Sequence, residues 1–520
     1  MQLPSLSNSE QPERSTIVPG AATALWLLLA INLFNYIDRQ VLSAVLPKLA
    51  LDATLFRPDD PNLQTKLGAL TTAFMVSYML LSPVFGWLGD TRSRWMLVGI
   101  GVILWSLASG GSGLATGFWM LLLTRCLVGV GEAAYGPVAP SMLSDMYPER
   151  QRGRILARFY LAIPVGSALG FVIGGQIADT SWGWRGAFMV VVLPGILLGA
   201  LCFLRKEPPR GAPPQRTGLR EYGRVFLRIL KVPSFRYNTI AMTASTFILG
   251  GVAAFAPLYI FNREASFQIS PEALGRLASL KTSDGTPVIP PEVIAKLQAK
   301  QGERAYRSEE LRTLLTETLT HEELKQYNLT LFEHLAARDS ITLSRISFLF
   351  GAIVVVSGLL ATLLGGMLGD KLRDHISGAY FRVAGIGCIV AFPFFLGMLL
   401  LPFPLAWVFM FIAVFGLFFN TGPANTILAN VVPSHIRATA FAINILIIHL
   451  LGDAISPLLI GLIADESSLH MAFLITSVFI LIAGIIWWMG ARHLARDSSA
   501  AVAQERAALN QSVASDLPAH

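Results

Sequence analysis

The chain has 520 residues, of which 53% are hydrophobic and 14% charged, and its mean hydropathy is +0.57. About a quarter of the residues of a soluble globular protein are charged, so this composition excludes an ordinary soluble protein and favours a chain whose surface faces lipid. The three cysteines lie in apolar runs and predict no disulfide framework. The formal net charge of +7 is informative only through its distribution along the chain.

Twelve apolar segments follow one another, each long enough for a membrane-spanning helix, which needs about 20 residues. Residues 1–21 are polar and lack the apolar region of a signal peptide, so we expect a terminal tail followed by a true first span. The predicted spans are 22–50, 66–89, 95–115, 118–147, 153–178, 184–204, 238–262, 343–369, 380–401, 403–432, 437–464 and 470–492.

Repeated sequences divide these spans into two sets of six. GWLGD at 86–90 ends the second span and GMLGD at 366–370 ends the eighth. GFVIGGQIAD at 170–179 and SPLLIGLIAD at 456–465 end the fifth and the eleventh. Such duplication in a membrane protein is typical of transporters. We predict an all-α membrane protein with 12 transmembrane helices in two pseudo-symmetric six-helix bundles, at 22–204 and 237–492.

Positive charge gathers in alternate loops, and the segment 205–236 between the halves holds nine Lys/Arg against two Glu. Because Lys and Arg concentrate on the cytoplasmic side, we expect this linker and both tails, 1–21 and 493–520, in the cytoplasm, and the protein in the bacterial inner membrane. Arg220, Arg224 and Arg228 recur every fourth residue. They predict an amphipathic helix on the membrane surface, or else a plain basic linker.

The segment 267–342, between spans seven and eight, is polar and carries charges of both signs. It contains three helix-start signals, at Ser270, at Pro291 and in the capping box from Thr320 to Glu323. We predict a small helical extracytoplasmic insert, which either belongs to the outer gate or is a passive insertion.

Four ionisable residues lie inside spans of the first half, where such residues are costly and usually functional. Asp38 and Arg39 lie in span one, and Arg125 and Glu132 share one face of span four, about 10 Å apart along the axis. Proton binding to a buried carboxylate would release or capture an Arg and so couple transport to protons. The alternative is a permanent ion-pair network that holds spans one and four together.

Polar residues in the second half allow two interpretations. His449 and Asp453, one turn apart in span eleven, form either a proton-carrying pair or a structural one. Asn420, Asn425 and Asn444 contact substrate or form hydrogen bonds between helices.

The ends of the second and eighth spans predict a cytoplasmic gate. Asp90 and Asp370 end their helices beside basic residues, and Arg94 and Arg154 are the expected partners. Such clusters lock one face by ion pairs and helix-end contacts and release when the halves rock. The alternative is a simple tight turn between spans.

Several of these segments resemble known families. GWLGDTRSR at 86–94 and RCLVGVGE at 125–132 resemble signatures of the major facilitator superfamily. NYIDRQVLSAVLP at 35–47, GEAAYGPVAP at 131–140 and HLLGDAISPLLIGLIAD at 449–465 resemble the Spinster family of lipid transporters. The resemblance covers nearly all spans, whereas the insert is longer than such carriers usually have.

The resemblance implies a proton-linked, alternating-access carrier of amphiphiles such as lysophospholipids or sphingosine phosphate. It also implies that Asp38 and Glu132 are protonation sites and that Arg39 and Arg125 are charge partners or headgroup contacts. We therefore expect the bilayer, protons and an amphiphilic substrate as partners of a monomer, with no cofactor, metal or nucleic acid.

Two other functions are alternatives to a lipid carrier. His334 and Asp339 have the spacing of an acyltransferase site, but they lie in a charged helical stretch without a glycine-rich pocket, so we expect no enzyme. A carrier of small organic anions such as sugar acids is the closer alternative, because both Arg residues would suit a carboxylate. The apolar neighbours of Thr243, Ser245 and Thr246 in span seven suit an acyl chain better.

Overall fold

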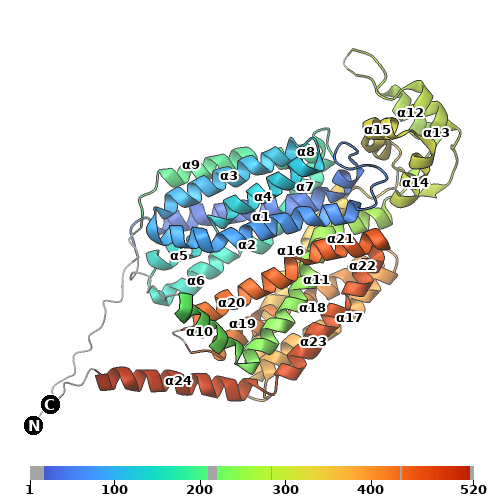
Figure 1. Ribbon diagram of the computed structural model, residues 1–520. Helices are drawn as coiled ribbons and strands as arrows, with labels where there is room; N and C mark the ends of the chain where they lie inside the picture. The colour runs from blue at the N-terminus through green and yellow to red at the C-terminus, as the bar shows by residue number, and fades with distance from the viewer. Residues whose placement is uncertain (1–16, 209–218, 283, 434–435, 516–520) are drawn as a thin grey trace, which may run out of the picture.

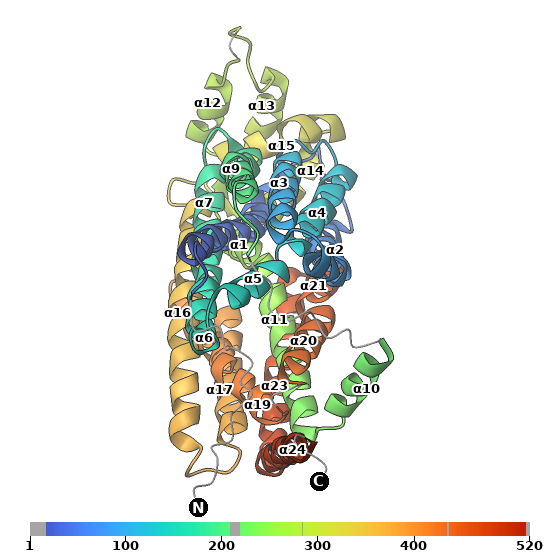
Figure 2. The ribbon, with the colours of Figure 1, turned by 90° about the vertical axis from the view of Figure 1, so that its left-hand side faces the viewer.

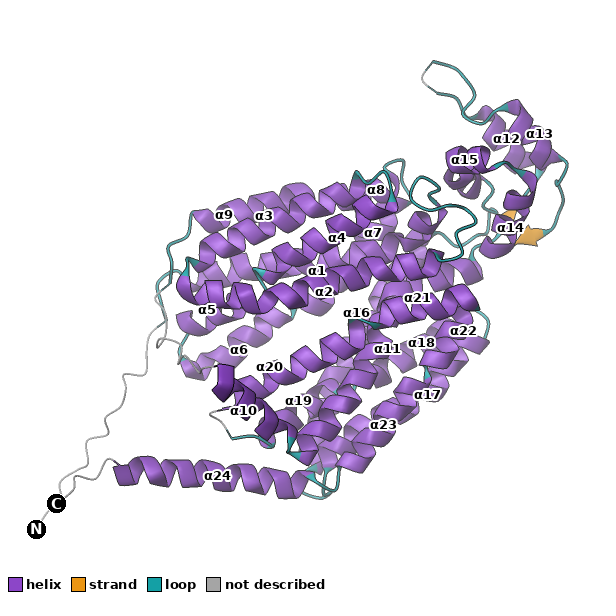
Figure 3. Ribbon diagram, viewed as in Figure 1, coloured by secondary structure: helices purple, strands orange, loops and turns teal. Residues whose placement is uncertain are grey.

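The computed structural model describes residues 17–208, 219–282, 284–433 and 436–515. Within these residues, twelve helices are long and apolar enough to cross a membrane. Figure 1 shows them as two bundles side by side, with a smaller helical unit beyond one end. The predicted all-α membrane fold is confirmed, and Figure 3 shows that strand is confined to the smaller unit.

The first half contains nine helices that form six spans, because three spans are made of two consecutive helices. They are α1 (Ala21–Leu51), α2 (Leu63–Thr91), α3 (Arg94–Gly113), α4 (Phe118–Ala133) with α5 (Val138–Met146), α6 (Glu149–Tyr160) with α7 (Ala162–Ala178), and α8 (Gly183–Met189) with α9 (Val192–Phe203).

The second half repeats this arrangement. Its helices are α11 (Pro233–Glu264), α16 (Leu343–Leu372), α17 (Ala379–Leu400), α18 (Leu405–Phe418) with α19 (Thr421–Asn430), α20 (Arg437–Ile448) with the π-helix His449–Asp453 and α21 (Ser456–Glu466), and α22 (Leu469–Thr476) with α23 (Val478–Gly490). The helix α11 starts four residues before the predicted boundary at 237, because Pro233 occupies its first turn.

The breaks in the fourth and tenth spans occur at matching sequences. The break between α4 and α5 includes Pro137, and Pro423 lies in the first turn of α19. Proline has no amide hydrogen and clashes with the carbonyl four residues earlier. Each span is therefore interrupted near its Gly-Pro sequence, at 136–137 in the fourth span and at 422–423 in the tenth. The duplication seen in sequence is therefore also a duplication of helix geometry.

The halves meet chiefly where α7 packs on α16 and α2 packs on α21. These contacts are close. A Cβ added to Gly68 of α2 would lie 2.2 Å from the Pro457 carbonyl oxygen, and one added to Gly175 of α7 would lie 2.4 Å from Ser347 Oγ. Both glycines lie toward the end of the bundle that carries the smaller unit. We call this the insert end, and the opposite end the linker end.

In its described residues, 267–282 and 284–342, the insert contains four helices and one pair of strands. They are α12 (Pro271–Ser279), α13 (Pro291–Gln298), α14 (Ser308–Thr318), α15 (His321–His334), β1 (Phe267–Gln268) and β2 (Ala305–Tyr306). The strands are antiparallel, with Phe267 opposite Tyr306. Two helices begin at Pro271 and Pro291, and the capping box at Thr320 starts α15, as predicted. The rings of Phe267 and Phe332 meet edge to face inside the insert, and both residues belong to a buried apolar cluster that continues into the bundle.

The linker forms α10 (Leu219–Leu230), which lies against the second half beside α20 and α11 (Figure 2). Ile229 is fully buried, and Phe226 and Leu230 pack on the core of that half. Protein covers these three residues, whereas Leu227 of the same helix is exposed. Contact of this helix with the membrane surface stays a prediction.

The segment 493–520, expected to be a tail, forms the helix α24 (Leu494–Ser515) in its described part. The carboxylate of Asp497 accepts a hydrogen bond of 2.8 Å from the Ser234 backbone amide, at the start of α11. The α11 N-terminus, where unpaired amides favour an anion, thus holds the first turn of α24.

Candidate functional site

A buried ion pair joins the first and fourth spans. Glu132 of α4 is 1% exposed, and its Oε2 accepts a hydrogen bond of 2.6 Å from Nε of Arg39 of α1. Nη2 of Arg39 lies 2.6 Å from the same oxygen and completes the ion pair. The Arg39 side chain keeps 18% of its surface exposed, whereas that of Glu132 has none. Solvent or a ligand can therefore reach the cation of this pair but not the anion.

Three aromatic rings surround the Arg39 guanidinium. Its central carbon lies 5.0 Å from the ring centre of Tyr36 and 5.1 Å from those of Phe74 and Tyr78. A cation over aromatic faces is attracted to them by about 0.5 to 2 kcal/mol each. The rings therefore hold the guanidinium in place when its bond to Glu132 is broken.

The other two charges are buried like Glu132 and contact serines of α3. Asp38 is 1% exposed, and its Oδ1 accepts a short hydrogen bond from Ser109. Arg125 is 2% exposed, donates to Ser112 Oγ at 2.8 Å from Nη2, and lies over the ring of Phe188. Both Arg125 and Arg39 attract Asp38 electrostatically. The sequence did not single out Ser109 and Ser112, because serine is common in spanning helices.

The predicted quartet of Asp38, Arg39, Arg125 and Glu132 is thus brought together within one half. Its formal charge is zero when both carboxylates are ionised. One oxygen of each carboxylate, Asp38 Oδ2 and Glu132 Oε1, is buried and has no hydrogen-bond partner among the described residues. A buried acceptor without a partner is costly and can accept a proton.

The predicted pair of His449 and Asp453 is in contact in the second half. His449 Nδ1 lies 2.9 Å from both carboxylate oxygens of Asp453, at the two ends of the π-helix His449–Asp453. π-helical turns within α-helices are often found at functional sites. The two side chains are 36% and 22% exposed, so this pair is more accessible than the pair of Arg39 and Glu132.

The predicted asparagines separate into two kinds. Asn420 and Asn444 are buried and bond between helices: Asn420 donates to Ser245 Oγ at 3.3 Å, and Asn444 accepts from Thr239 Oγ1 at 2.8 Å. Asn425 is exposed and donates to the Thr421 carbonyl in its own helix. The contacts of Asn420 and Asn444 therefore support their structural interpretation.

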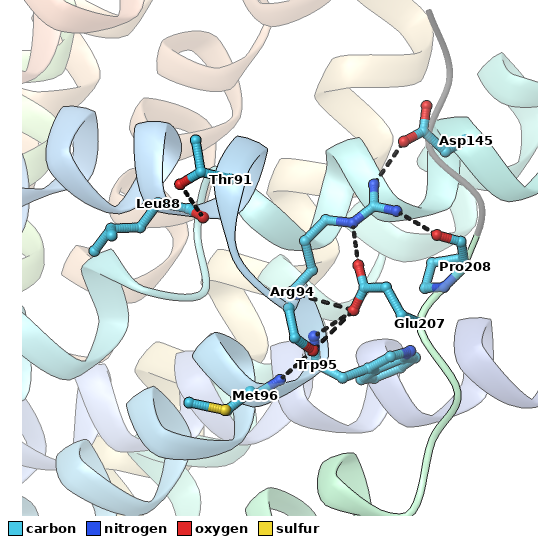
Figure 4. A network of polar contacts seen from close by, with 9 residues as sticks. Leu88, Thr91, Arg94, Trp95, Met96, Asp145, Glu207 and Pro208 are labelled. Carbon is cyan, nitrogen blue, oxygen red and sulfur yellow. Dashed lines mark hydrogen bonds and ion pairs between the residues drawn. The ribbon is translucent and has the colours of Figure 1, made fainter. Parts of the chain in front are cut away.

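At the linker end, Arg94 forms a network within the first half (Figure 4). Its guanidinium lies 2.5 Å from Asp145 of α5 and 2.8 Å from Glu207, and it donates to the Pro208 carbonyl at 2.9 Å. Glu207 also accepts from the Arg94 backbone amide, at the start of α3. Arg94 therefore ties the ends of α3 and α5 to the start of the linker.

The other three predicted gate residues are Asp370, Asp90 and Arg154, and only the contacts of Asp370 are described. Asp370 accepts a 2.8 Å hydrogen bond from the Tyr380 hydroxyl, also within its own half. Asp90 and Arg154 lie in α2 and α6, but their side chains are outside the described residues. A gate between the halves at this end stays a prediction.

The duplicated six-span halves and a charged cluster between spans define a membrane transporter of the major facilitator class. The family model of the Major Facilitator Superfamily matches residues 28–280 and 317–516, leaving out part of the insert. The chain is 31% identical to protein spinster homolog 3 of Danio rerio, over 89% of this chain and 82% of that protein. It is 32% identical to protein spinster homolog 1 of Homo sapiens, over 89% and 77%. The chain belongs to the Spinster family of this superfamily and is a transporter, not an enzyme.

Solved structures share the fold. A bacterial homologue of the human lysosomal transporter Spinster, inward-facing and unoccupied, has a TM-score of 0.68 at 20% identity and covers 92% of this chain and 98% of that one. A D-xylose–proton symporter has a TM-score of 0.59 at 17% identity, over 90% and 97%.

Proposed function

We propose that this protein is a proton-coupled carrier of amphiphilic, lipid-like substrates of the lysophospholipid or sphingoid phosphate class, working by alternating access. The observation that carries the proposal is the pair of Arg39 and Glu132, in which a buried carboxylate holds a guanidinium that remains accessible. Asp38 and Arg125 are the second carboxylate and the second cation of the same cluster.

The geometry suggests how a proton acts on substrate binding. While Glu132 is ionised, it forms an ion pair with Arg39 and competes with an anionic headgroup for the guanidinium. A proton on Glu132 removes this competition, and the rings of Tyr36, Phe74 and Tyr78 keep the freed guanidinium in position. Proton and anion then bind cooperatively, and by linkage each strengthens the other.

The polar contacts of α11 support an amphiphile over a sugar acid. The Thr243 hydroxyl donates to the Thr239 carbonyl in its own helix, and Ser245 accepts from Asn420. These hydroxyls already have protein partners. The neighbouring Phe247 and Ile248 are apolar and buried, so this stretch of α11 offers few free hydrogen-bonding groups to a sugar acid. Small organic anions such as sugar acids remain the alternative substrate class.

We place the linker end in the cytoplasm, so that both termini are cytoplasmic and the insert is outside. Support comes from the nine Lys/Arg in the sequence of 205–236, a segment whose described parts lie at the end of the bundle opposite the insert. We further propose a monomer in the bacterial inner membrane.

Uptake into proteoliposomes with an imposed pH gradient tests the coupling. Glu132→Gln keeps the shape of the side chain and an acceptor for Arg39 but cannot exchange a proton. We expect gradient-driven uptake of a lysophospholipid to fall to the level without a gradient, while exchange at equal pH continues. Unchanged gradient-driven uptake in both Glu132→Gln and Asp38→Asn would remove these residues from coupling.

Thermal stabilisation of the purified protein tests the substrate class. We expect a lysophospholipid or a sphingoid phosphate to raise the melting temperature, and Arg39→Ala to reduce the shift. Stabilisation by sugar acids alone would reject the lipid substrate in favour of the alternative.

A further inference from the structure

Three sets of contacts join the two halves at the insert end, and each is made at the end of a helix. Two are made by aspartates at equivalent positions of the repeat, and the third is made by the insert. Backbone groups at helix ends have no partner within the helix, so they bond readily to side chains of another element.

The first contact is made by Asp465 of α21. Its two carboxylate oxygens accept hydrogen bonds from the backbone amides of Gln64 and Thr65, both at 2.8 Å, in the first turn of α2. Asn62, the residue that precedes α2, makes no capping hydrogen bond with its own side chain. The second half thus supplies the side chain that caps this helix of the first half.

The second contact is its counterpart. Asp179, which follows α7, accepts a 2.6 Å hydrogen bond from the Ser344 amide in the first turn of α16. Asp179 and Asp465 end the repeated sequences at 170–179 and 456–465, and α16 is the repeat of α2. Each half therefore caps the equivalent helix of the other. The capping is not equal, because Thr342 also caps α16, by accepting from the Arg345 amide.

The third contact has no counterpart in the first half, because the insert makes it. Asn328 of α15 is 5% exposed and donates to the Leu51 carbonyl at 2.7 Å, and Arg312 of α14 donates to the Ala50 carbonyl at 3.3 Å. These are the last carbonyls of α1. A cation at a helix C-terminus is also favoured electrostatically.

An ion pair links the insert to one of the aspartates. Lys48 of α1 lies 2.8 Å from Glu333 of the insert and 3.9 Å from Asp179. The same residues line a cavity of about 440 Å³ between the insert and the bundle, together with Phe261 and Phe332. The insert therefore meets the first half around this cavity and through polar contacts, beside apolar residues of α1 and of the insert that belong to one buried cluster.

We propose that these contacts form the outer gate of the carrier, with the two aspartates as paired latches and the insert as an added clamp on α1. The proposal rests on the alternating-access cycle and orientation given above. Since every contact joins one half to the other, opening the outer side breaks all of them. The gate is closed in this structure, and the insert is an active part of it.

Cysteine labelling tests the gate without substrate or pH gradient, so its outcome does not depend on proton coupling. Cys126, Cys202 and Cys388 are first replaced by serine. Ser347→Cys then serves as the reporter. Ser347 of α16 is fully buried against Gly175 of α7, and its hydroxyl has no partner among the described residues. A membrane-impermeant maleimide added at the insert side labels it only when the halves part.

The gate variants are made in the Ser347→Cys protein, and the labelling rate of that cysteine is measured. We expect Asp465→Ala to raise it about tenfold, and Asp179→Asn and Asn328→Ala about threefold each. Asp52→Asn is the matched control. Asp52 lies at the same end, but its partners Thr54, Trp184 and Arg185 all belong to the first half. It should leave the labelling rate unchanged.

A second reporter separates opening from general loosening. Ser456→Cys is equally buried, but Ser456 lies against Gly250 and Gly251 within the second half. Its labelling should stay at the starting rate in all variants. The gate would be overturned if labelling of Ser347→Cys stays unchanged in both Asp465→Ala and Asn328→Ala. It would also be overturned if labelling increases equally at both reporters. If Asp465→Ala does not fold, Asp465→Asn, which keeps one acceptor oxygen, and Asn328→Ala decide the question.

Discussion

The two halves share one arrangement of helices, but their interiors differ in charge. The first half buries Asp38, Arg125 and Glu132, each no more than 2% exposed. The second half has neutral polar groups instead: Asn238 donates to the Ala424 carbonyl and accepts from the Trp487 indole nitrogen. A neutral network keeps its hydrogen bonds at any pH, whereas a charged one changes when a proton binds. Duplication thus supplied two scaffolds, of which one is suited to respond to protons and the other to keep its shape.

Removing one buried charge should reveal this difference most strongly. Arg125→Met removes the cation that attracts Asp38 most strongly and leaves the buried cluster with excess negative charge, and breaking a buried charge network in this way costs about 3 to 5 kcal/mol. We expect a large drop in the melting temperature of the purified protein. The double variant Asp38→Asn/Arg125→Met removes both charges and should recover much of the loss. If the double variant is as unstable as Arg125→Met, the two charges do not interact.

Removing a neutral partner in the second half should cost less. Asn238→Ala leaves the buried Trp487 indole N–H without its acceptor, which costs about 1 to 3 kcal/mol. The matched control is Asn425→Ala, because Asn425 is exposed and bonds only within its own helix. It should change the melting temperature little. Equal losses in Asn238→Ala and Arg125→Met would contradict the contrast between the two interiors.

Some of this contrast could be predicted from sequence. Charged residues in apolar spans are conspicuous, because burying them is costly, so the quartet could be identified before its geometry was known. The twelve spans and the helix starts of the insert follow from equally local signals, namely apolar length, proline and capping residues.

The remaining features depend on tertiary contacts. Tyr36, Phe74 and Tyr78 look like ordinary apolar positions until the fold places them around Arg39. The repeated Asp179 and Asp465 could be recognised as part of the duplication, but their partners lie on helices of the opposite half. Capping signals are usually sought within about three residues of the helix that they cap, and so they could not find these contacts.

The titratable pair of the second half tests whether proton coupling is confined to the first. His449 and Asp453 are partly exposed, and ion pairs of this kind contribute little. We expect Asp453→Asn to slow gradient-driven uptake less than about tenfold, equivalent to about 1.4 kcal/mol, and to preserve its dependence on the pH gradient. Loss of that dependence, as expected for Glu132→Gln, would assign the second half a share in coupling.

The insert, which the first half lacks, should show the smallest and most local effect of pH. Lys296 donates to both carboxylate oxygens of Glu323, at 2.8 and 2.9 Å, and this contact lowers the pKa of Glu323 below its usual value of 4.5. Hydrogen bonds from Thr282 and Thr286 lower the pKa of Asp284 to about 2. A carboxyl whose pKa is lower in the folded state than in the unfolded state stabilises the insert at any pH above the unfolded-state pKa. This stabilisation is lost as the pH falls toward the folded-state pKa.

Hydrogen exchange of the insert checks this sign. After correction for intrinsic rates, the amides of α13 and α15 should exchange with constant protection from neutral pH to about 5 and lose protection below about 4.5, while the spanning helices stay protected. Glu323→Gln should open these helices about twofold to fivefold more at neutral pH and weaken the acid response. Constant protection of the insert through the acid range would show that these carboxylates do not stabilise it. Equal losses in the insert and in the spans would show that the insert does not unfold separately from the bundle it covers.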